Sequence, residues 1–289
     1  MSVTDPLDIT RLLDEAVRLS RRHFRDVFLP VALPVAGAAS VMSALQVGMS
    51  MQRPGEGGPS ILGLAAFVVA LLVYLLVYMG GYAAMQSAAL DAAAGRRVDM
   101  GAAWMTLARP SVLLTWLLVG LGVFAGLLCC MLPGMYLGLL WAMAIPVVLE
   151  ERLAYAAALA RSGELMRHNP VGGLGNHPML HAFLLFFVGG ILSYALSTLI
   201  SLPMMAIIAF AAFRAASSGQ AGDADQAMQA VMWIQVPVQF ASALVQIAVQ
   251  VFVTMGMALL YFELRRRREG DDLVAAIDTV GAGAPPTAP

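Results

Sequence analysis

The sequence contains no lysine and little charge of either sign. All 17 of its basic residues are arginines, and charged residues make up only 12% of the chain, about half the fraction usual in a soluble domain. Hydrophobic residues make up 60%. There is no basic domain and no interleaving of aromatic and basic residues, so nucleic acid is excluded as a partner. The length suits one membrane domain without a separate soluble catalytic domain.

Cysteine and catalytic motifs are also scarce. The two cysteines, Cys129 and Cys130, are neighbours in an apolar run, and adjacent residues do not easily close a relaxed disulfide. We interpret them as small residues at lipid depth rather than as a redox pair. The sequence lacks His-Glu-x-x-His, Gly-x-Ser-x-Gly and a glycine-rich phosphate loop. We therefore expect no catalytic residues and no cofactor, and an intramembrane enzyme is the least favoured of three hypotheses.

Nearly all arginines lie in every second gap between the long apolar stretches of the chain. All but Arg53 and Arg214 lie before residue 27, at 91–110, at 150–181 or after residue 263. Arginine-bearing loops of a multi-spanning protein stay on the cytoplasmic side. The pattern predicts a multi-pass protein of the bacterial cytoplasmic (inner) membrane with both termini in the cytoplasm.

Between the polar gaps lie apolar stretches of spanning length, which predict an all-α polytopic bundle of about six transmembrane helices with amphipathic cytoplasmic surface helices. The expected spans are 27–49, 61–90, 111–131, 134–149, 181–203 and 236–262. Pro133 and Gly134 interrupt the block 111–149, so it forms either two short spans or a re-entrant hairpin. Both ends lie on one side in either case. Pro237 predicts a kink near the start of the last span.

The predicted domains are a cytoplasmic amphipathic helix over 1–26, a membrane domain over 27–264, and an arginine collar with a disordered tail over 265–289. The first segment has acidic residues and no apolar core, so we expect no cleaved signal peptide. Its helix lies either on the inner membrane surface or on the protein's own cytoplasmic face. We expect further polar helices at 99–109 and 150–167.

Two stripes of uncharged polar side chains run along the last two spans. In the last span, Gln235, Gln239, Ser242, Gln246 and Gln250 fall within about an 80° arc of one helix face. The fifth stretch carries Ser193, Ser197 and Ser201 at successive i+4 positions. Glutamine in hydrocarbon is costly without a partner, so the stripe faces protein or water. One interpretation is a structural role, in which the stripe forms hydrogen-bonded contacts between helices or across a dimer. The alternative is that it lines a polar cavity.

Ionisable residues cluster only at the inner interface. Glu150 and Glu263 end two spans, and we expect them to pair with Arg152 and Arg265. His168, His177 and His181 form the one histidine cluster. The four-residue spacing of His177 and His181 suits two metal ligands, but no carboxylate or cysteine follows at ligand spacing. We expect no metal site, with these histidines as weak candidates.

Arginines flank the membrane at both ends of the chain and suit anionic lipid headgroups of the inner leaflet. The candidates are Arg21, Arg22, Arg25, Arg265, Arg266, Arg267 and Arg268. The glycine pairs at 80–81 and 189–190 predict close helix packing. A homo-oligomer or a membrane-protein partner is a further expectation, because the glutamine stripe can face another protomer.

Three passages together resemble a bacterial integral-membrane family. They are 131–150, which begins Met-Leu-Pro-Gly and ends at Glu150, then 157–167 with the pair Arg161-Ser162, and 260–273 with Tyr261, four arginines and Glu-Gly-Asp-Asp-Leu. The family is named for the membrane domain of glycerophosphoryl diester phosphodiesterase and has YciC-like relatives. The resemblance implies a six-span helical protein. The family's hydrolase activity belongs to a separate barrel domain, so no such activity is implied for this chain.

The expected function is a non-enzymatic scaffold or accessory role in membrane or lipid organisation or in partner recruitment. The alternative is a channel or transporter whose polar cavity is lined by the glutamine stripe and the serines. The sequence does not distinguish a cavity from contacts to the fifth stretch or to another protomer.

Overall fold

The protein is all-helical in the computed structural model, which describes residues 9–50, 61–168, 173–218 and 221–282. No strand occurs in these ranges. Six helical segments are long and apolar enough to cross a membrane, which confirms the predicted all-α bundle. The predicted outer turn at 53–59 lies outside the described residues. The helices are α1 (Ile9–Ser50), α2 (Ile61–Ala93), α3 (Met100–Trp104), α4 (Pro110–Cys129), α5 (Met131–Leu140), α6 (Ala144–Glu150), α7 (Tyr155–Arg167), α8 (Pro178–Ser218) and α9 (Ala221–Ala282).

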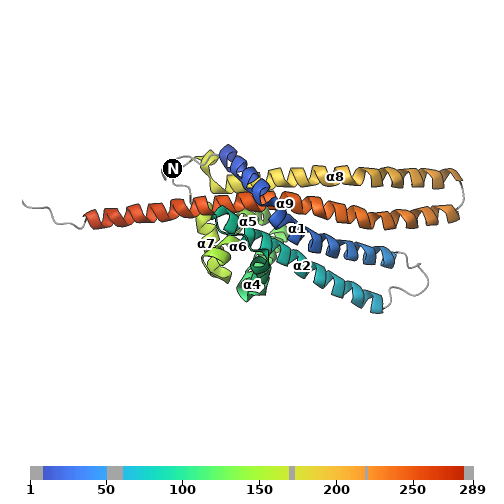
Figure 1. Cartoon of the computed structure of the whole chain (residues 1–289), viewed down its shortest axis with the longest axis horizontal. Helices are drawn as coiled ribbons and strands as arrows, with labels where there is room; N and C mark the ends of the chain where they lie inside the picture. Colours follow the sequence, from blue (N-terminus) through green and yellow to red (C-terminus); the bar gives the residue numbers. More distant parts are fainter. Residues whose placement is uncertain (1–8, 51–60, 169–172, 219–220, 283–289) are drawn as a thin grey trace, which may run out of the picture.

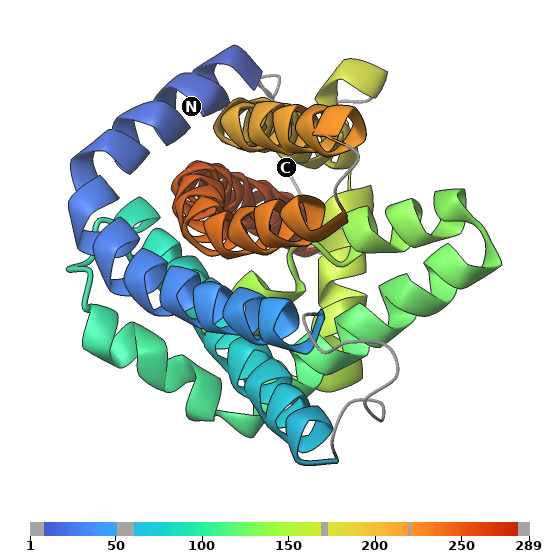
Figure 2. The same cartoon turned by 90° about the vertical axis from the view of Figure 1, so that its right-hand side faces the viewer.

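The last helix, α9, is the centre of the bundle. Figure 2 shows it surrounded by α1, α2 and α8, and Figure 1 shows these long helices running side by side. Many α9 residues between Val249 and Leu264 are fully or almost fully buried, whereas most large apolar side chains in the N-terminal half of α2 are exposed. The bundle therefore packs most tightly around the part of α9 between Val249 and Leu264.

Helix α1 joins the predicted amphipathic segment and the first span without a break. It contains Pro30 and Pro34, and its direction changes clearly in Figure 2, as is usual where proline removes a helix hydrogen bond. The face that carries Leu12 and Ala16 is buried. A Cβ atom on Gly256 of α9 would lie 3.5 Å from the Ala16 Cβ. The apolar face of this segment therefore packs on the protein's own helices.

Helices α8 and α9 both end later than predicted. Helix α9 passes through the arginine collar and continues to Ala282, so the segment 265–289 is helical up to Ala282, where a disordered tail was predicted to follow the collar. Residues 283–289 lie outside the described part. Helix propensity explains the difference, because 273–279 contains mostly residues that a helix accepts. Helix α8 also extends beyond the predicted span 181–203, because it ends at Ser218.

The block 111–149 forms a hairpin followed by a short helix. The turn is at Cys130, just before the predicted Pro133-Gly134 break, and a second break at 141–143 separates α5 from α6. A Cβ on Gly126 would lie 2.9 Å from the Gly134 Cα, so only glycine allows this approach of the two arms. Figure 2 shows the hairpin projecting sideways from the long helices. In Figure 1 it lies beside the half of the bundle that holds α6 and α7.

The two short polar helices form, but the second begins at Tyr155 rather than at the predicted Glu150, which ends α6. Asp99 caps α3, since its carboxylate accepts hydrogen bonds from Gly101 N at 2.9 Å and Ala102 N at 3.3 Å. A 3₁₀ turn over Met105–Ala108 completes this segment. Helix α7 carries buried Ser162, whose hydroxyl donates to the Leu140 carbonyl at 2.8 Å. The Asp99 bonds stabilise the start of α3, and the Ser162 bond joins α7 to the end of α5.

Three of the four paired glycines are close-packing points. A Cβ on Gly80 would lie 2.7 Å from the Trp104 ring, and one on Gly81 would lie 2.9 Å from Val35. A Cβ on Gly189 would overlap the Val253 side chain, whereas Gly190 has open space. The packing prediction thus holds for Gly80, Gly81 and Gly189, but not for Gly190.

Gly189→Ala and Gly190→Ala form a matched pair. We expect Gly189→Ala to lower the free energy of unfolding by about 1–3 kcal/mol, because α8 must move away from Val253 of α9. We expect Gly190→Ala to be neutral or slightly stabilising, because alanine is the better helix former. Thermal unfolding of the two variants in detergent measures the difference. Equal effects would contradict the described α8–α9 contact.

Candidate functional site

A pocket of about 220 Å³ opens between α1, α2, α8 and α9. We call it the glutamine–tyrosine pocket. Its polar lining is Tyr74, Tyr78 and Tyr82 of α2, Ser193 of α8, and Gln239, Gln246 and Gln250 of α9. Its apolar lining is Val31, Val35, Ala39, Met85, Ala243 and Ile247. None of these side chains is charged at neutral pH.

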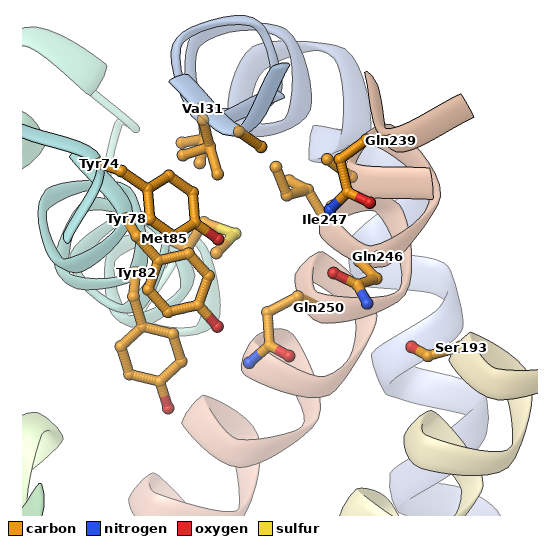
Figure 3. Close-up of a pocket in the computed structure, with 13 residues that line it drawn as sticks. Val31, Tyr74, Tyr78, Tyr82, Met85, Ser193, Gln239, Gln246, Ile247 and Gln250 are labelled. Atoms are coloured by element: carbon orange, nitrogen blue, oxygen red, sulfur yellow. The ribbon is translucent and has the colours of Figure 1, made fainter. Parts of the chain in front are cut away.

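The glutamines and the tyrosines face each other across the pocket, as Figure 3 shows. Gln239 and Gln250 are eleven positions apart, so the amides extend over about 16 Å of α9 at 1.5 Å per residue. Tyr74 and Tyr82 extend over about 12 Å of α2. Amide and phenol groups both donate and accept hydrogen bonds. The pocket is therefore a recess with a polar lining within a hydrophobic bundle.

The structure divides the predicted glutamine stripe. Gln239, Gln246 and Gln250 line the pocket, but Gln235 and Ser242 are not among its lining residues. Gln235 lies one turn before the first lining glutamine, whereas Ser242 lies between Gln239 and Gln246 and is still not part of the lining.

The serine stripe of α8 is divided in the same way. Only Ser193 lines the pocket. The Ser201 hydroxyl donates to the backbone carbonyl of Ser197 at 2.8 Å, so it bonds within its own helix. The Ser197 hydroxyl is buried and has no partner in the part of the chain that the structure describes. The serines therefore do not form a ladder of hydrogen bonds to α9.

The glutamine amides favour a cavity over helix contacts. Among the described residues, Gln239, Gln246 and Gln250 make no side-chain hydrogen bond, and their amide atoms are not sealed from space. Amides that join two helices are instead hydrogen-bonded across the interface. Gln239 and Gln246 are exposed and Gln250 is half-buried, so their amides are open to water or to a ligand.

The tyrosines were not predicted as site residues. Tyr74, Tyr78 and Tyr82 recur every four residues in a segment that otherwise reads as lipid-facing. This spacing places three hydroxyls on one helix face, and it is the signal in the sequence that indicates them. The spacing is missed when tyrosine is treated only as a hydrophobic residue.

A second polar cluster lies apart from the pocket, where α6 meets α7, α9 and the segment that follows α2. Arg96 bonds both oxygens of Glu150 and also Asp91, at 2.7 Å. The hydrogen bond to Glu150 raises the pKa of Arg96. Glu150 thus pairs with Arg96, and the predicted pairing with Arg152 is wrong because Arg96 reaches it from the end of α2.

Glu151 joins three elements. Its carboxylate accepts a bond from Arg161 of α7 at 3.0 Å and one from the Tyr261 hydroxyl of α9 at 3.0 Å. Burial lowers the pKa of Arg161, but the charge of Glu151 raises it, and the net shift is upward. The three passages that carry the family resemblance meet here, since Glu151 directly follows the first of them. We call Glu151, Arg161 and Tyr261 the Glu151 cluster.

The arginine collar is partly used within the protein. Glu263 pairs with Arg266 at 2.8 Å and with Arg267 at 3.0 Å, and Arg265 pairs with Glu269 at 2.7 Å. The predicted Glu263–Arg265 pair is wrong, because on a helix the third and fourth following residues face Glu263. Arg267 is buried, so it is not available to lipid headgroups. Arg21, Arg22 and Arg25 are exposed.

The histidines serve the start of α8. The His177 Nδ1 accepts a hydrogen bond from Met179 N at 3.2 Å, which caps the helix. The ring of His181 is buried, and its Nδ1 lies 3.1 Å from the His177 carbonyl oxygen. Within the described ranges, no group of three or more histidine, cysteine or acidic side chains is arranged to hold a metal ion. Cys129 and Cys130 are exposed thiols at the hairpin turn.

Comparisons of the chain with protein-family models, with curated proteins and with solved structures gave no match.

Proposed function

We propose that the chain is a multi-pass membrane protein that binds an uncharged polar molecule in the glutamine–tyrosine pocket and passes it, in the manner of a channel or transporter. One observation carries the proposal. Three glutamine amides without partners in the described structure face three tyrosines across about 220 Å³ of space. Helix contacts alone do not account for this arrangement.

The lining favours a neutral ligand. A charged molecule that enters a hydrophobic bundle loses its hydration, and the pocket lining offers no opposite charge to compensate for that loss. At about 30 Å³ per water molecule, the volume holds about seven waters or one small solute. Small polyols and amides meet both conditions.

The test is solute flux through liposomes that contain the purified chain. Stopped-flow light scattering with glycerol, urea and xylitol measures uncharged solutes, and a potassium-sensitive dye measures ion leak. We expect accelerated passage of at least one uncharged solute without ion leak. Rates equal to those of empty liposomes for all three solutes would contradict the proposal.

A second candidate is the scaffold role, and the exposed arginines of α1 favour it. Arg21, Arg22 and Arg25 are exposed on the segment whose opposite face packs on α9. They suit anionic lipid headgroups or an acidic partner. We also propose, from the resemblance of the three passages that meet near Glu151, that the chain is related to the family named for the membrane domain of glycerophosphoryl diester phosphodiesterase, and this relation suits the scaffold role equally well. Solute flux by the isolated chain would rule out a purely scaffolding function.

We further propose that the arginine-bearing end faces the cytoplasm of a bacterial cell, with both termini on that side. The Arg96–Glu150 and Arg161–Glu151 pairs hold the arginine-bearing loop after α2 and helix α7 against the end of α6. The C-terminal ends of α1 and α8 and the N-terminal ends of α2 and α9 lie at the opposite end of the bundle in Figure 1. This separation supports the orientation expected from arginine-rich loops.

The two native cysteines test how the hairpin sits in the membrane. Because the hairpin stays beside the α6–α7 half in Figure 1, we expect Cys129 and Cys130 to resist a membrane-impermeant maleimide added from outside. Ile61→Cys in a chain with both native cysteines replaced by alanine is the positive control, because Ile61 is 89% exposed at the outer end of α2. Labelling of the native pair from outside would show that the hairpin spans the membrane.

A further inference from the structure

An apolar groove of about 590 Å³ runs between α1 and α2. Its lining includes Val41 of α1 and Leu62, Val69 and Val73 of α2, and all four side chains are exposed. From Leu62 to Tyr74 the groove follows α2 for about 18 Å, at 1.5 Å per residue. Tyr74 is the only polar residue of the lining. The groove therefore belongs to the surface that faces lipid in a multi-pass membrane protein.

The groove lies next to the glutamine–tyrosine pocket. Among the described residues, Tyr74 is the one side chain that lines both spaces. Figure 3 shows its ring turned toward the pocket beside Tyr78, and the two ring centroids lie 6.1 Å apart. On α1, Ala38 lines the groove and the following residue, Ala39, lines the pocket. The two spaces thus adjoin where α1 and α2 pass Tyr74.

Packing alone holds the Tyr74 side chain. Its ring packs against the small cluster of Ala36, Ala39 and Ala243, where α1, α2 and α9 meet. Its hydroxyl makes no hydrogen bond within the described part of the chain. The Tyr82 hydroxyl, in contrast, accepts a hydrogen bond from Gln86 Nε2 at 3.1 Å. No hydrogen bond has to break when the Tyr74 ring moves, so this residue is the movable part of the boundary.

The different chemistry of the two spaces selects the ligand. Hydrocarbon fills an apolar groove that opens to a bilayer, because water finds no polar partners there. An acyl chain that enters the groove from the bilayer leaves an equally apolar surrounding, so its transfer costs little. The pocket offers three amides and three phenols without any charge. A molecule that fills both spaces therefore has one hydrocarbon chain and an uncharged head with hydroxyl groups.

We propose that the pocket and the groove together bind a monoacylglycerol, with the glycerol head among the glutamines and tyrosines, the acyl chain in the groove and the Tyr74 ring moved aside between them. A phospholipid head is disfavoured, because the pocket lining has no charge opposite to that of the phosphate. The chain points toward Leu62, away from the arginine-bearing end, as in a lipid of the leaflet on the arginine side. This inference rests on the proposed function, since it needs a pocket that binds an uncharged polar group.

The test is photolabelling of the protein in lipid nanodiscs with a monoacylglycerol that carries a diazirine on its chain. Phosphatidylglycerol with the same chain is the comparison probe, because it adds a charged phosphate to a glycerol head. Mass spectrometry locates the labels. The exposed segment 199–208 of α8 reports ordinary lipid contact. We expect the monoacylglycerol to label 62–73 about thirtyfold more than 199–208, the effect of two hydrogen bonds to the head, and phosphatidylglycerol to label both segments alike.

Two variants connect the groove to the pocket. Gln239→Leu together with Gln246→Leu should remove the enrichment, because the head loses both amides while the groove is unchanged. Ala70→Trp should remove it by filling the groove. Ala125→Trp is the matched control, because Ala125 is exposed on α4 and lines neither space, so the enrichment should stay the same.

Three outcomes decide against the inference. Equal enrichment of the phosphatidylglycerol probe, or enrichment that survives loss of the two glutamines, would show that chains enter the groove without a head in the pocket. Either result in a protein that still passes glycerol or xylitol would overturn the monoacylglycerol assignment and leave the proposed function intact. Absence of both solute flux and enrichment would overturn the two together.

Discussion

Replacing Gln239 and Gln246 together by leucine should lower uncharged-solute flux about thirtyfold while the protein remains folded. Each amide lines the pocket and has no partner in the described residues, so its hydrogen bonds are available to the solute. Two lost bonds of about 1 kcal/mol each raise the barrier by about 2 kcal/mol, which corresponds to this factor. Stopped-flow light scattering of proteoliposomes measures the rate.

Stability is the second readout of the same variant. Leucine is favourable in a membrane helix, so thermal unfolding in detergent should not occur earlier than in wild type. Gln235→Leu is the matched control, because it changes the same stripe outside the pocket lining and should leave the rate unchanged. If the double variant instead fails to fold, the glutamines hold helices together, and the cavity interpretation is wrong.

Glu151→Ala should lower the free energy of unfolding by about 2–3 kcal/mol. The carboxylate accepts bonds from Arg161 and from the hydroxyl of Tyr261, and hydrogen bonds to charged groups contribute about 1.5–3 kcal/mol each. The side chain of Arg161 is 21% exposed, so water recovers part of the loss. Thermal unfolding in detergent measures the change.

Two further variants isolate the cause. Glu164 pairs with the same arginine at 3.4 Å but its side chain is 59% exposed, so Glu164→Ala should cost less than about 1 kcal/mol. Glu151→Gln keeps an acceptor for Tyr261 and removes the charge that faces Arg161, so an intermediate loss is expected. Equal losses for Glu151→Ala and Glu164→Ala would show that the Glu151 cluster does not join α6, α7 and α9.

Hydropathy and arginine spacing predict the helical class and the positions of the long helices, because both follow from local composition. They do not predict how a helix continues. Pro30 and Pro34 bend α1 without ending it, so the surface helix and the first span form one element. The break at 141–143, between α5 and α6, also has no clear signal in the sequence.

Only one side of the site could be predicted, because sequence periodicity is a local signal. Periodicity identifies the face of α9 that carries Gln239, Gln246 and Gln250, but it does not identify what lies opposite that face. The partners, Tyr74 and Tyr78, come from a helix more than 150 positions earlier in the chain, so tertiary packing brings them together. Ion pairs follow the same rule, since Glu150 meets Arg96 rather than the nearby Arg152.

The central claim is that the glutamine–tyrosine pocket holds an uncharged polar molecule. An experimental structure in lipid nanodiscs, determined with and without xylitol, tests it most directly. We predict density between the Gln246 amide and the Tyr78 hydroxyl that changes when xylitol is present. Glutamine amides bonded to Ser193, to Ser197 or to a second protomer, with side chains filling the space, would contradict the account.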